Sequence, residues 1–181
     1  MDKKTFKNKE NPCINHYGEK IWVSRSVAVA GVIIALYDNK RYVLTSKRGP
    51  NAADFQGLYN LTCGYLDWDE SGPEAMIREL YEETGFDMDL ITVDQILKQH
   101  MDQPWYVASN PTQSRQNVTL RYGLYFMTNK LPKLTTKYNP VIGEVVDPIW
   151  MPLEDINNHE WAFNHNDVIR HYMGVALWIH D

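Results

Sequence analysis

The sequence has few cysteines, no excess of basic residues and no long hydrophobic run. Its two cysteines, Cys13 and Cys63, lie far apart and outside any CxxC pair, which argues against a disulfide framework and a zinc ribbon. The formal net charge of −5 argues against broad electrostatic binding to nucleic acid or an anionic membrane, although an acidic site with bound metal still accepts phosphates. We therefore expect two reduced thiols and a small-molecule partner, not a DNA duplex.

No apolar run approaches the roughly 18 residues that a membrane-spanning helix needs, and the first residues are polar and charged. These features predict no signal peptide, no membrane span and a cytoplasmic location. The 181 residues, 44% of them hydrophobic, can build one sizeable core. We expect a loosely ordered polar extension over residues 1–20 and one domain over residues 21–181. We also consider a homodimer, because such an extension can cover a partner subunit.

The chain predicts strands, one helix, more strands and a closing helix. Residues rich in β-branched or alternating side chains predict strands over 21–37, 41–46, 59–63, 89–93, 95–101, 117–127 and 141–150. The first two form a hairpin, and 95–101 could equally be a helical turn. Residues 102–116 predict a long loop and 129–140 a loop or edge. Apolar spacing predicts a short helix after residue 151 and a closing helix over 166–179. This order predicts an α/β sandwich with a mixed sheet.

The stretch from Gly64 to Phe86 contains the most informative pattern. Within it Glu79, Glu82 and Glu83 stand at i, i+3 and i+4, so a helix places all three carboxylates on one face. The apolar residues fall on the opposite side of that helix: Met76, Ile77, Leu80, Tyr81 and Thr84.

Terminal signals bound this helix. Ser71 with Glu74 three residues later predicts a capping box, Pro73 suits the first turn, and Gly85 suits the position after the last turn. We expect the helix from Pro73 to Thr84. A solvated amphipathic helix is the alternative interpretation of three glutamates at this spacing. Like charges so placed repel by a few tenths of a kcal/mol per pair, so the cluster needs a reason such as a bound cation.

The whole stretch, GYLDWDESGPEAMIRELYEETGF, resembles a complete Nudix box, the signature of the Nudix hydrolases. Seven exact residues and two apolar positions match without a mismatch. The resemblance implies a Nudix-type α/β/α sandwich in which a loop, a helix and a loop hold Mg²⁺ or Mn²⁺ against a diphosphate. Attack by water then splits the phosphoanhydride.

Within the box we assign metal binding first to Glu82 and Glu83, because carboxylate oxygens suit Mg²⁺ and Mn²⁺. Glu79 is a ligand or the general base. Arg78 supports the site by pairing with a glutamate, either Glu74 or Glu82 at i±4 or one that it orients near the metals. The resemblance also implies structural or outer-shell roles for Gly64, Glu70 and Gly85.

Three further residues are candidates outside the box pattern. Cys63 stands where most family members have a glycine whose carbonyl binds metal; its own carbonyl can still coordinate, while its thiol suits a small buried hydrophobe better than a magnesium ligand. Glu144 resembles the acid of a distant loop that serves as general base or ligand, with Asp147 as the lesser alternative; a surface glutamate is the competing interpretation. Arg48 follows the strand predicted over 41–46 and lies close to the box, where it contacts either solvent or phosphate.

The substrate is less well defined by the sequence. Gln103-Pro104-Trp105 resembles part of the motif of the NADH-cleaving branch, whereas Arg115-Gln116-Asn117-Val118 resembles ADP-ribose or nucleotide-sugar members. Trp105 and Tyr106 could stack on a base or pack within the loop, and Arg115 is a further candidate for substrate binding.

Several functions follow from these features. We favour a divalent-metal-dependent hydrolase that cleaves a nucleoside diphosphate linked to another group, ADP-ribose-like first. A nucleoside triphosphate, a dinucleoside polyphosphate, NADH or an RNA 5′ end is the alternative substrate. A non-catalytic nucleotide sensor is the alternative of a different class, and loss of box carboxylates would favour it; none is lost.

Overall fold

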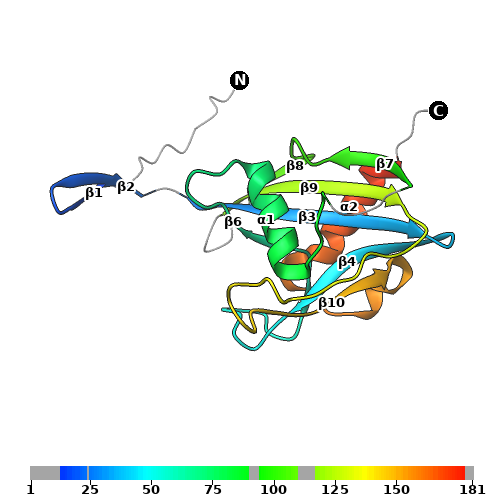
Figure 1. Ribbon diagram of the computed structural model, residues 1–181. Coiled ribbons are helices and arrows are strands. Elements are labelled where there is room, and N and C mark those ends of the chain that lie inside the picture. The colour runs from blue at the N-terminus through cyan, green and yellow to red at the C-terminus, as the bar shows by residue number, and fades with distance from the viewer. Residues whose placement is uncertain (1–12, 24, 90–93, 110–116, 178–181) are drawn as a thin grey trace, which may run out of the picture.

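The computed structural model describes residues 13–23, 25–89, 94–109 and 117–177 (Figure 1). Its first half contains β1 (Cys13–His16), β2 (Glu19–Trp22), β3 (Val27–Tyr37), β4 (Lys40–Arg48), β5 (Tyr59–Asn60), β6 (Cys63–Tyr65) and α1 (Gly72–Thr84). Its second half contains β7 (Gln95–His100), β8 (Tyr106–Ser109), β9 (Val118–Met127), β10 (Val145–Pro152), two 3₁₀ segments at Leu153–Asn158 and Ala162–Asn164, and α2 (His165–Leu177).

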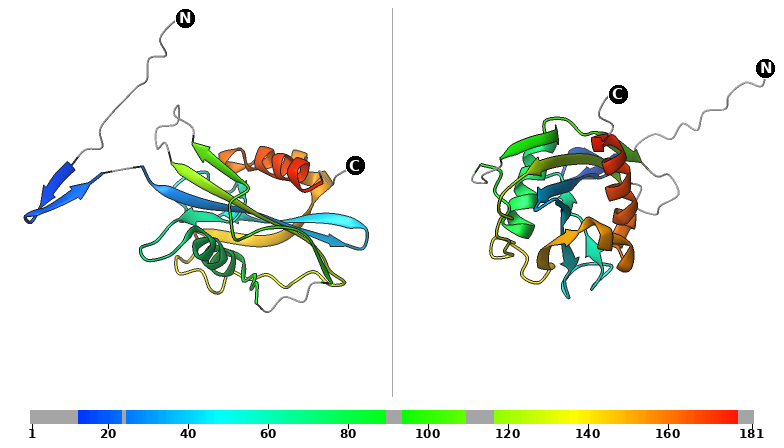
Figure 2. Two further views of the ribbon diagram at one scale, coloured as in Figure 1. Left: turned by 90° about the horizontal axis from the view of Figure 1, so that it is seen from above. Right: turned by 90° about the vertical axis from the view of Figure 1, so that its right-hand side faces the viewer.

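One mixed sheet forms the centre of the domain. Its main path runs β10-β4-β3-β9-β7, while β5 pairs with β4, β6 with β3 and β8 with β9. Only the β3–β9 pair is parallel among these pairings of the described strands. Helices α1 and α2 cover opposite faces of the sheet (Figure 2). The result is the expected α/β/α sandwich.

Alternation along β3 creates two cores. Val32 and Ile34 join the cluster under α2, and Ile33 and Ala35 join the cluster under α1. All four are at most 1% exposed, which a central strand buried on both faces requires. Neither helix in the described part of the chain has the length and apolarity to cross a membrane.

The predicted strand over 21–37 is wrong in its first part. Residues 19–22 instead pair with residues 13–16 in a separate hairpin, which lies away from the body of the sheet in Figures 1 and 2. The turn signals are local, because Tyr17 and Gly18 have positive φ and the Gly18 amide donates to the Asn15 side chain. The described part of the extension, residues 13–20, is therefore mostly hairpin.

Other boundaries differ for similar reasons. The strand predicted over 59–63 is two short strands, because the chain leaves β4 after Asn60 and pairs with β3 from Cys63. The predicted loop 102–116 contains β8, which pairs with the edge of β9. The segment after Asp94 is the strand alternative, β7, whereas residues 90–93 of the predicted strand 89–93 lie outside the described residues, as does Ile179 of the closing helix.

The predicted caps of α1 are confirmed. The Ser71 hydroxyl accepts from the Glu74 amide, the Glu74 carboxylate accepts from the Ser71 amide, and Gly85 ends the helix at φ 67°. The buried side was predicted incorrectly in part, because Ile77 is 43% and Tyr81 36% exposed. Contact with the sheet is centred on Met76 and Leu80, with the carboxylates on one flank of that line and Ile77 and Tyr81 on the solvent flank.

Candidate active site

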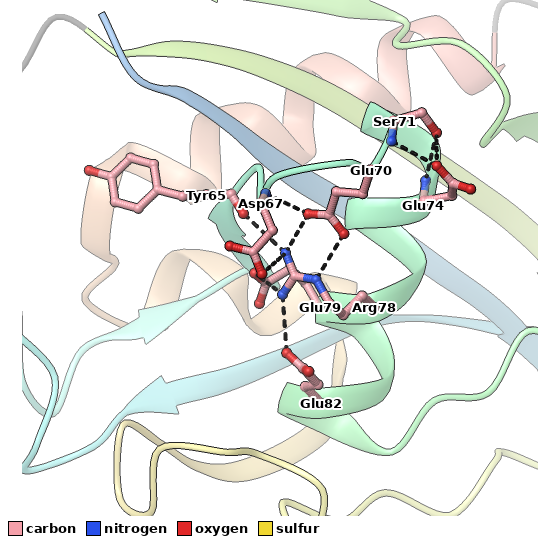
Figure 3. Close-up of polar contacts among 8 residues, drawn as sticks. All are labelled: Tyr65, Asp67, Glu70, Ser71, Glu74, Arg78, Glu79 and Glu82. Carbon is pink, nitrogen blue, oxygen red and sulfur yellow. Dashed lines mark hydrogen bonds and ion pairs between the residues drawn. The ribbon is translucent and has the colours of Figure 1, made fainter. Parts of the chain in front are cut away.

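Arg78 is the centre of an ion-pair network on α1 (Figure 3). Its Nε and Nη2 bind the two oxygens of Glu70 at 3.0 and 2.8 Å. Its Nη1 donates to Glu79 at 2.8 Å and to Glu82 at 3.1 Å, and Nη2 also donates to the Tyr65 carbonyl at 3.1 Å. The hydrogen bond to Glu70, followed by the neighbouring charges, raises the pKa of Arg78 and lowers that of Glu70. These hydrogen bonds need the planar guanidinium with its several N–H donors, which lysine cannot supply.

The network shows which glutamates pair with Arg78. The alternative pairing with Glu74 is not formed, because the Glu74 carboxylate is engaged by Ser71. Glu70 is further fixed by the Asp67 amide, 2.7 Å away. The arginine thus connects the loop before the helix with Glu79 and Glu82.

Gly64 makes room for Glu79. A Cβ built on Gly64 would lie 2.0 Å from Glu79 Oε1, so only glycine admits the carboxylate in this position. Glu79 therefore lies against β6 at Gly64, the residue at which the box begins. Gly64 itself pairs with Val29 of β3.

Glu83 is the most deeply buried of the box carboxylates that face the cavity. It is 5% exposed, and its Oε2 accepts from the Cys63 amide at 3.3 Å. Burial raises the pKa of Glu83 well above its usual value, and the charges of Glu79 and Glu144 raise it further. Burial also raises the pKa of Glu79 despite the opposing charge of Arg78. Such a cluster is costly unless a cation compensates it.

The Cys63 side chain is in a setting that suppresses its thiolate. Burial, then the charge of Glu83, raises the pKa of the Cys63 thiol, so the side chain is a poor nucleophile. The residue is partly exposed and lines the cavity.

Glu144 is brought to the same wall by a tight backbone contact. The Gly49 amide donates to the Glu144 carbonyl at 2.6 Å, and the Asn51 amide donates to the Gly143 carbonyl at 2.9 Å. A Cβ on Gly49 would lie 2.2 Å from the Gly143 carbonyl oxygen, so the close approach needs glycine. Asp147, the lesser alternative, is not among the cavity-lining residues of the described chain; it forms a 3.9 Å ion pair with Lys47.

These residues line one end of a cavity of about 680 Å³. The structure brings eight of the predicted site residues to it: Arg48, Cys63, Gly64, Arg78, Glu79, Glu82, Glu83 and Glu144. Arg48 is 9% exposed, bonds the carbonyl and carboxylate of Asp54, and has its guanidinium carbon 5.2 Å from the Phe163 ring centroid. It is therefore a braced cation in the lining of the same cavity as the carboxylates.

Two predicted substrate residues do not line the cavity of the described chain. The Trp105 ring contacts the core under α2, with its Nε1 donating to the Tyr122 carbonyl at 3.1 Å and its ring 5.3 Å from that of Tyr172. Tyr106 is 43% exposed and lies over Arg121. Arg115 lies outside the described residues.

Sequence reasoning missed the basic end of the cavity, formed by Arg121 of β9 and His165 of α2. Arg121 carried a signal, because alternation along β9 places it on the same face as the core residue Tyr125. The His165 ring is 6% exposed, and its Nδ1 accepts from the Leu61 amide at 2.9 Å. Burial, with the charges of Arg121 and Arg48, lowers the pKa of His165 to about 3.

The structure is a three-layer α/β/α sandwich with a carboxylate-lined cavity, and comparison with known proteins identifies the family. The NUDIX domain model matches residues 27–172. The chain therefore belongs to the Nudix family, and it is a Nudix hydrolase as the box predicted. A search of the curated proteins found no match.

Solved structures share the fold at low sequence identity. The NUDIX domain of Shewanella oneidensis NrtR complexed with ADP ribose matches with a TM-score of 0.60 and 21% identity over 84% of this chain and 89% of that chain. A bifunctional NMN adenylyltransferase/ADP ribose pyrophosphatase from Francisella tularensis, complexed with AMP and a Mn ion, matches with a TM-score of 0.61 and 22% identity over 84% and 42%. A MutT protein from Methanosarcina mazei gives 0.53 and 19% over 84% and 96%.

Proposed function

We propose that the protein hydrolyses a nucleoside diphosphate linked to another group, with ADP-ribose as the favoured substrate and Mg²⁺ or Mn²⁺ as cofactor. One observation carries the proposal: Glu79, Glu82, Glu83 and Glu144 converge on one end of a cavity large enough for a nucleotide. Two structures of similar fold bear on the substrate, since one is an ADP ribose complex and the other an ADP ribose pyrophosphatase.

The donor set fits a hard divalent cation. Carboxylate oxygens and the Cys63 carbonyl are ligands that Mg²⁺ and Mn²⁺ accept, and the burial of Glu83 beside Glu79 calls for positive charge. As the side chains stand, no three acidic, histidine or cysteine residues of the described ranges are close enough together to coordinate an ion. Arg78 holds Glu79 and Glu82, so we expect part of that network to rearrange when metal binds.

Each residue of the site has a separate role in the proposed reaction. Glu82, Glu83 and Glu79 would hold the cation, which when bound neutralises the diphosphate and activates water. Glu144, or Glu79 in its place, accepts the proton of the attacking water at a carboxylate oxygen. Arg78 positions Glu79 and Glu82, with Glu70 fixing the arginine.

Arg48 supplies the opposing charge. Nε and Nη2 are engaged by Asp54, which leaves the side chain oriented toward the cavity with Phe163 beneath it. A guanidinium so fixed can bind a phosphate oxygen without first losing rotamer freedom.

A substrate panel tests the proposal. ADP-ribose, a nucleotide sugar, NADH, ATP and a dinucleoside polyphosphate are incubated with Mg²⁺, and the released phosphate species are identified. We expect AMP and ribose 5-phosphate from ADP-ribose, and no release in chelator. Tight binding of ADP-ribose without turnover would instead favour the nucleotide sensor, and turnover of only another substrate would replace ADP-ribose.

A further inference from the structure

Arg121 and Cys63 lie on the same face of the sheet, with the small side chain of Ala30 between them. Cross-strand pairing aligns Cys63 with Ala30 and Ala30 with Arg121, and directly paired residues project from the same face of a sheet. Two strand spacings put the Cα atoms of Cys63 and Arg121 roughly 10 Å apart. Ala28 repeats the pattern two residues earlier, so alanine methyl groups leave the space between the two ends open.

The Arg121 guanidinium is held in place by an aromatic ring and has no polar partner in the described ranges. Its carbon lies 5.1 Å from the ring centroid of Tyr106, the residue paired with it across β8 and β9. No hydrogen bond or ion pair joins it to any described residue, although it is half-buried. Arg78, by contrast, is bonded to three glutamates. A guanidinium held in this way is ready to bind an anion.

His165 adds a neutral donor to the same end. Because its Nδ1 accepts from the Leu61 amide, the proton of the neutral ring is on Nε2. Two acids, Asp54 and Asp167, also line the cavity. Each is bonded by an arginine, Asp54 by Arg48 and Asp167 by Arg170, so neither offers its charge wholly to Arg121.

We propose that Arg121, with His165, forms a subsite for a phosphate of the substrate that is separate from the scissile diphosphate. The proposal rests on the proposed function and deepens it. A neutral sugar or base at this end would leave the guanidinium unpaired, whereas a phosphate can accept two parallel N–H bonds from Arg121 and one from His165. That phosphate comes either from a monoester on a ribose or from a longer phosphate chain.

Binding of ligands that cannot be hydrolysed tests the subsite directly. Calorimetry with Mg²⁺ compares adenosine 2′,5′-bisphosphate with 5′-AMP, and a methylene-bridged ATP analogue with its ADP counterpart. The extra phosphate should tighten binding by about tenfold to a hundredfold in at least one pair, and Arg121→Gln should abolish that difference while leaving the smaller ligand unchanged. Arg41→Gln, at an exposed arginine of β4 outside the cavity lining, is the control and should retain it.

Kinetics then identify the source of the phosphate. Arg121→Gln should lower kcat/KM for 2′-phospho-ADP-ribose or for a dinucleoside tetraphosphate by about tenfold or more, and leave ADP-ribose within about twofold. The substrate that loses rate identifies the source. Equal losses on all substrates, or no gain from either extra phosphate in the wild type, would overturn the subsite. Discrimination in binding without any hydrolysis would contradict the proposed function and leave the subsite standing.

Discussion

Gly64→Ala should separate catalysis from folding. The Gly64 backbone does not need a positive φ, so alanine is conformationally acceptable there. Its Cβ would lie 2.0 Å from Glu79 Oε1 and 2.3 Å from Cδ of the same carboxylate. The three nearest atoms to this Cβ position all belong to the end of the flexible Glu79 side chain.

The size of the effect follows from these distances. Normal contact begins near 3.5 Å, so the carboxylate must move by about 1.5 Å, which breaks its 2.8 Å contact with Arg78. Misplacement of a catalytic group by about 1 Å can cost on the order of 10²-fold in rate. We expect kcat to fall about a hundredfold, while unfolding free energy changes by less than about 1 kcal/mol, a shift of roughly 2–4 °C or less in Tm.

The assay measures hydrolysis of ADP-ribose and thermal unfolding on the same preparations. Gly174→Ala is the matched control, because nothing lies within 4 Å of its Cβ position on the exposed side of α2. That control should keep full activity and gain about 0.5–1 kcal/mol from helix propensity. Full activity of Gly64→Ala would refute either the placement of Glu79 beside Gly64 or the requirement of the reaction for Glu79.

Three further predictions concern single residues. Trp105→Ala should lower stability by about 3 kcal/mol in denaturant unfolding and leave the KM for ADP-ribose unchanged; a raised KM with intact stability would put the ring on the nucleotide. Glu144→Gln should lower kcat far more than it raises KM in steady-state kinetics, and an unchanged kcat would return the base to Glu79. The pKa of His165 is about 3 in the folded protein and near 6.5 otherwise, so the unfolded chain binds the extra proton and stability is lost as pH falls below 6.5. The free energy of unfolding, measured in denaturant, should fall by about 2 kcal/mol between pH 7 and pH 5 because of this group. This loss should be absent in His165→Gln. Equal pH dependence of the two proteins would contradict the prediction.

Local signals made the helix and its carboxylates predictable from sequence. The capping box, Pro73 and Gly85 act within one turn of each end, so no distant contact was needed to define α1. The i, i+3, i+4 spacing placed Glu79, Glu82 and Glu83 together for the same reason. Spacing could not show that the sheet contacts only part of the apolar side, and Ile77 was therefore misplaced.

Distant pairings explain what the sequence left open. The role of Trp105 as a packing residue depends on β8 joining the edge of β9, and the polar, proline-containing sequence around it predicted only a loop. Arg121 of β9 and His165 of α2 line the same cavity because α2 packs against the sheet, a distant contact that sequence spacing does not show. An arginine on the inward face of a strand was the one available signal, since such a position is normally apolar.

The central claim is that the α1 carboxylates act through a divalent cation, and Glu83→Gln tests it most directly. Hydrolysis of ADP-ribose is measured against Mg²⁺ concentration, with and without chelator, for the wild type and this variant, together with their melting temperatures. We expect wild-type activity to vanish in chelator and return with Mg²⁺ or Mn²⁺, and the folded variant to lose most of its rate at every Mg²⁺ concentration. Full activity of the wild type in chelator, or of Glu83→Gln at ordinary Mg²⁺, would contradict the account.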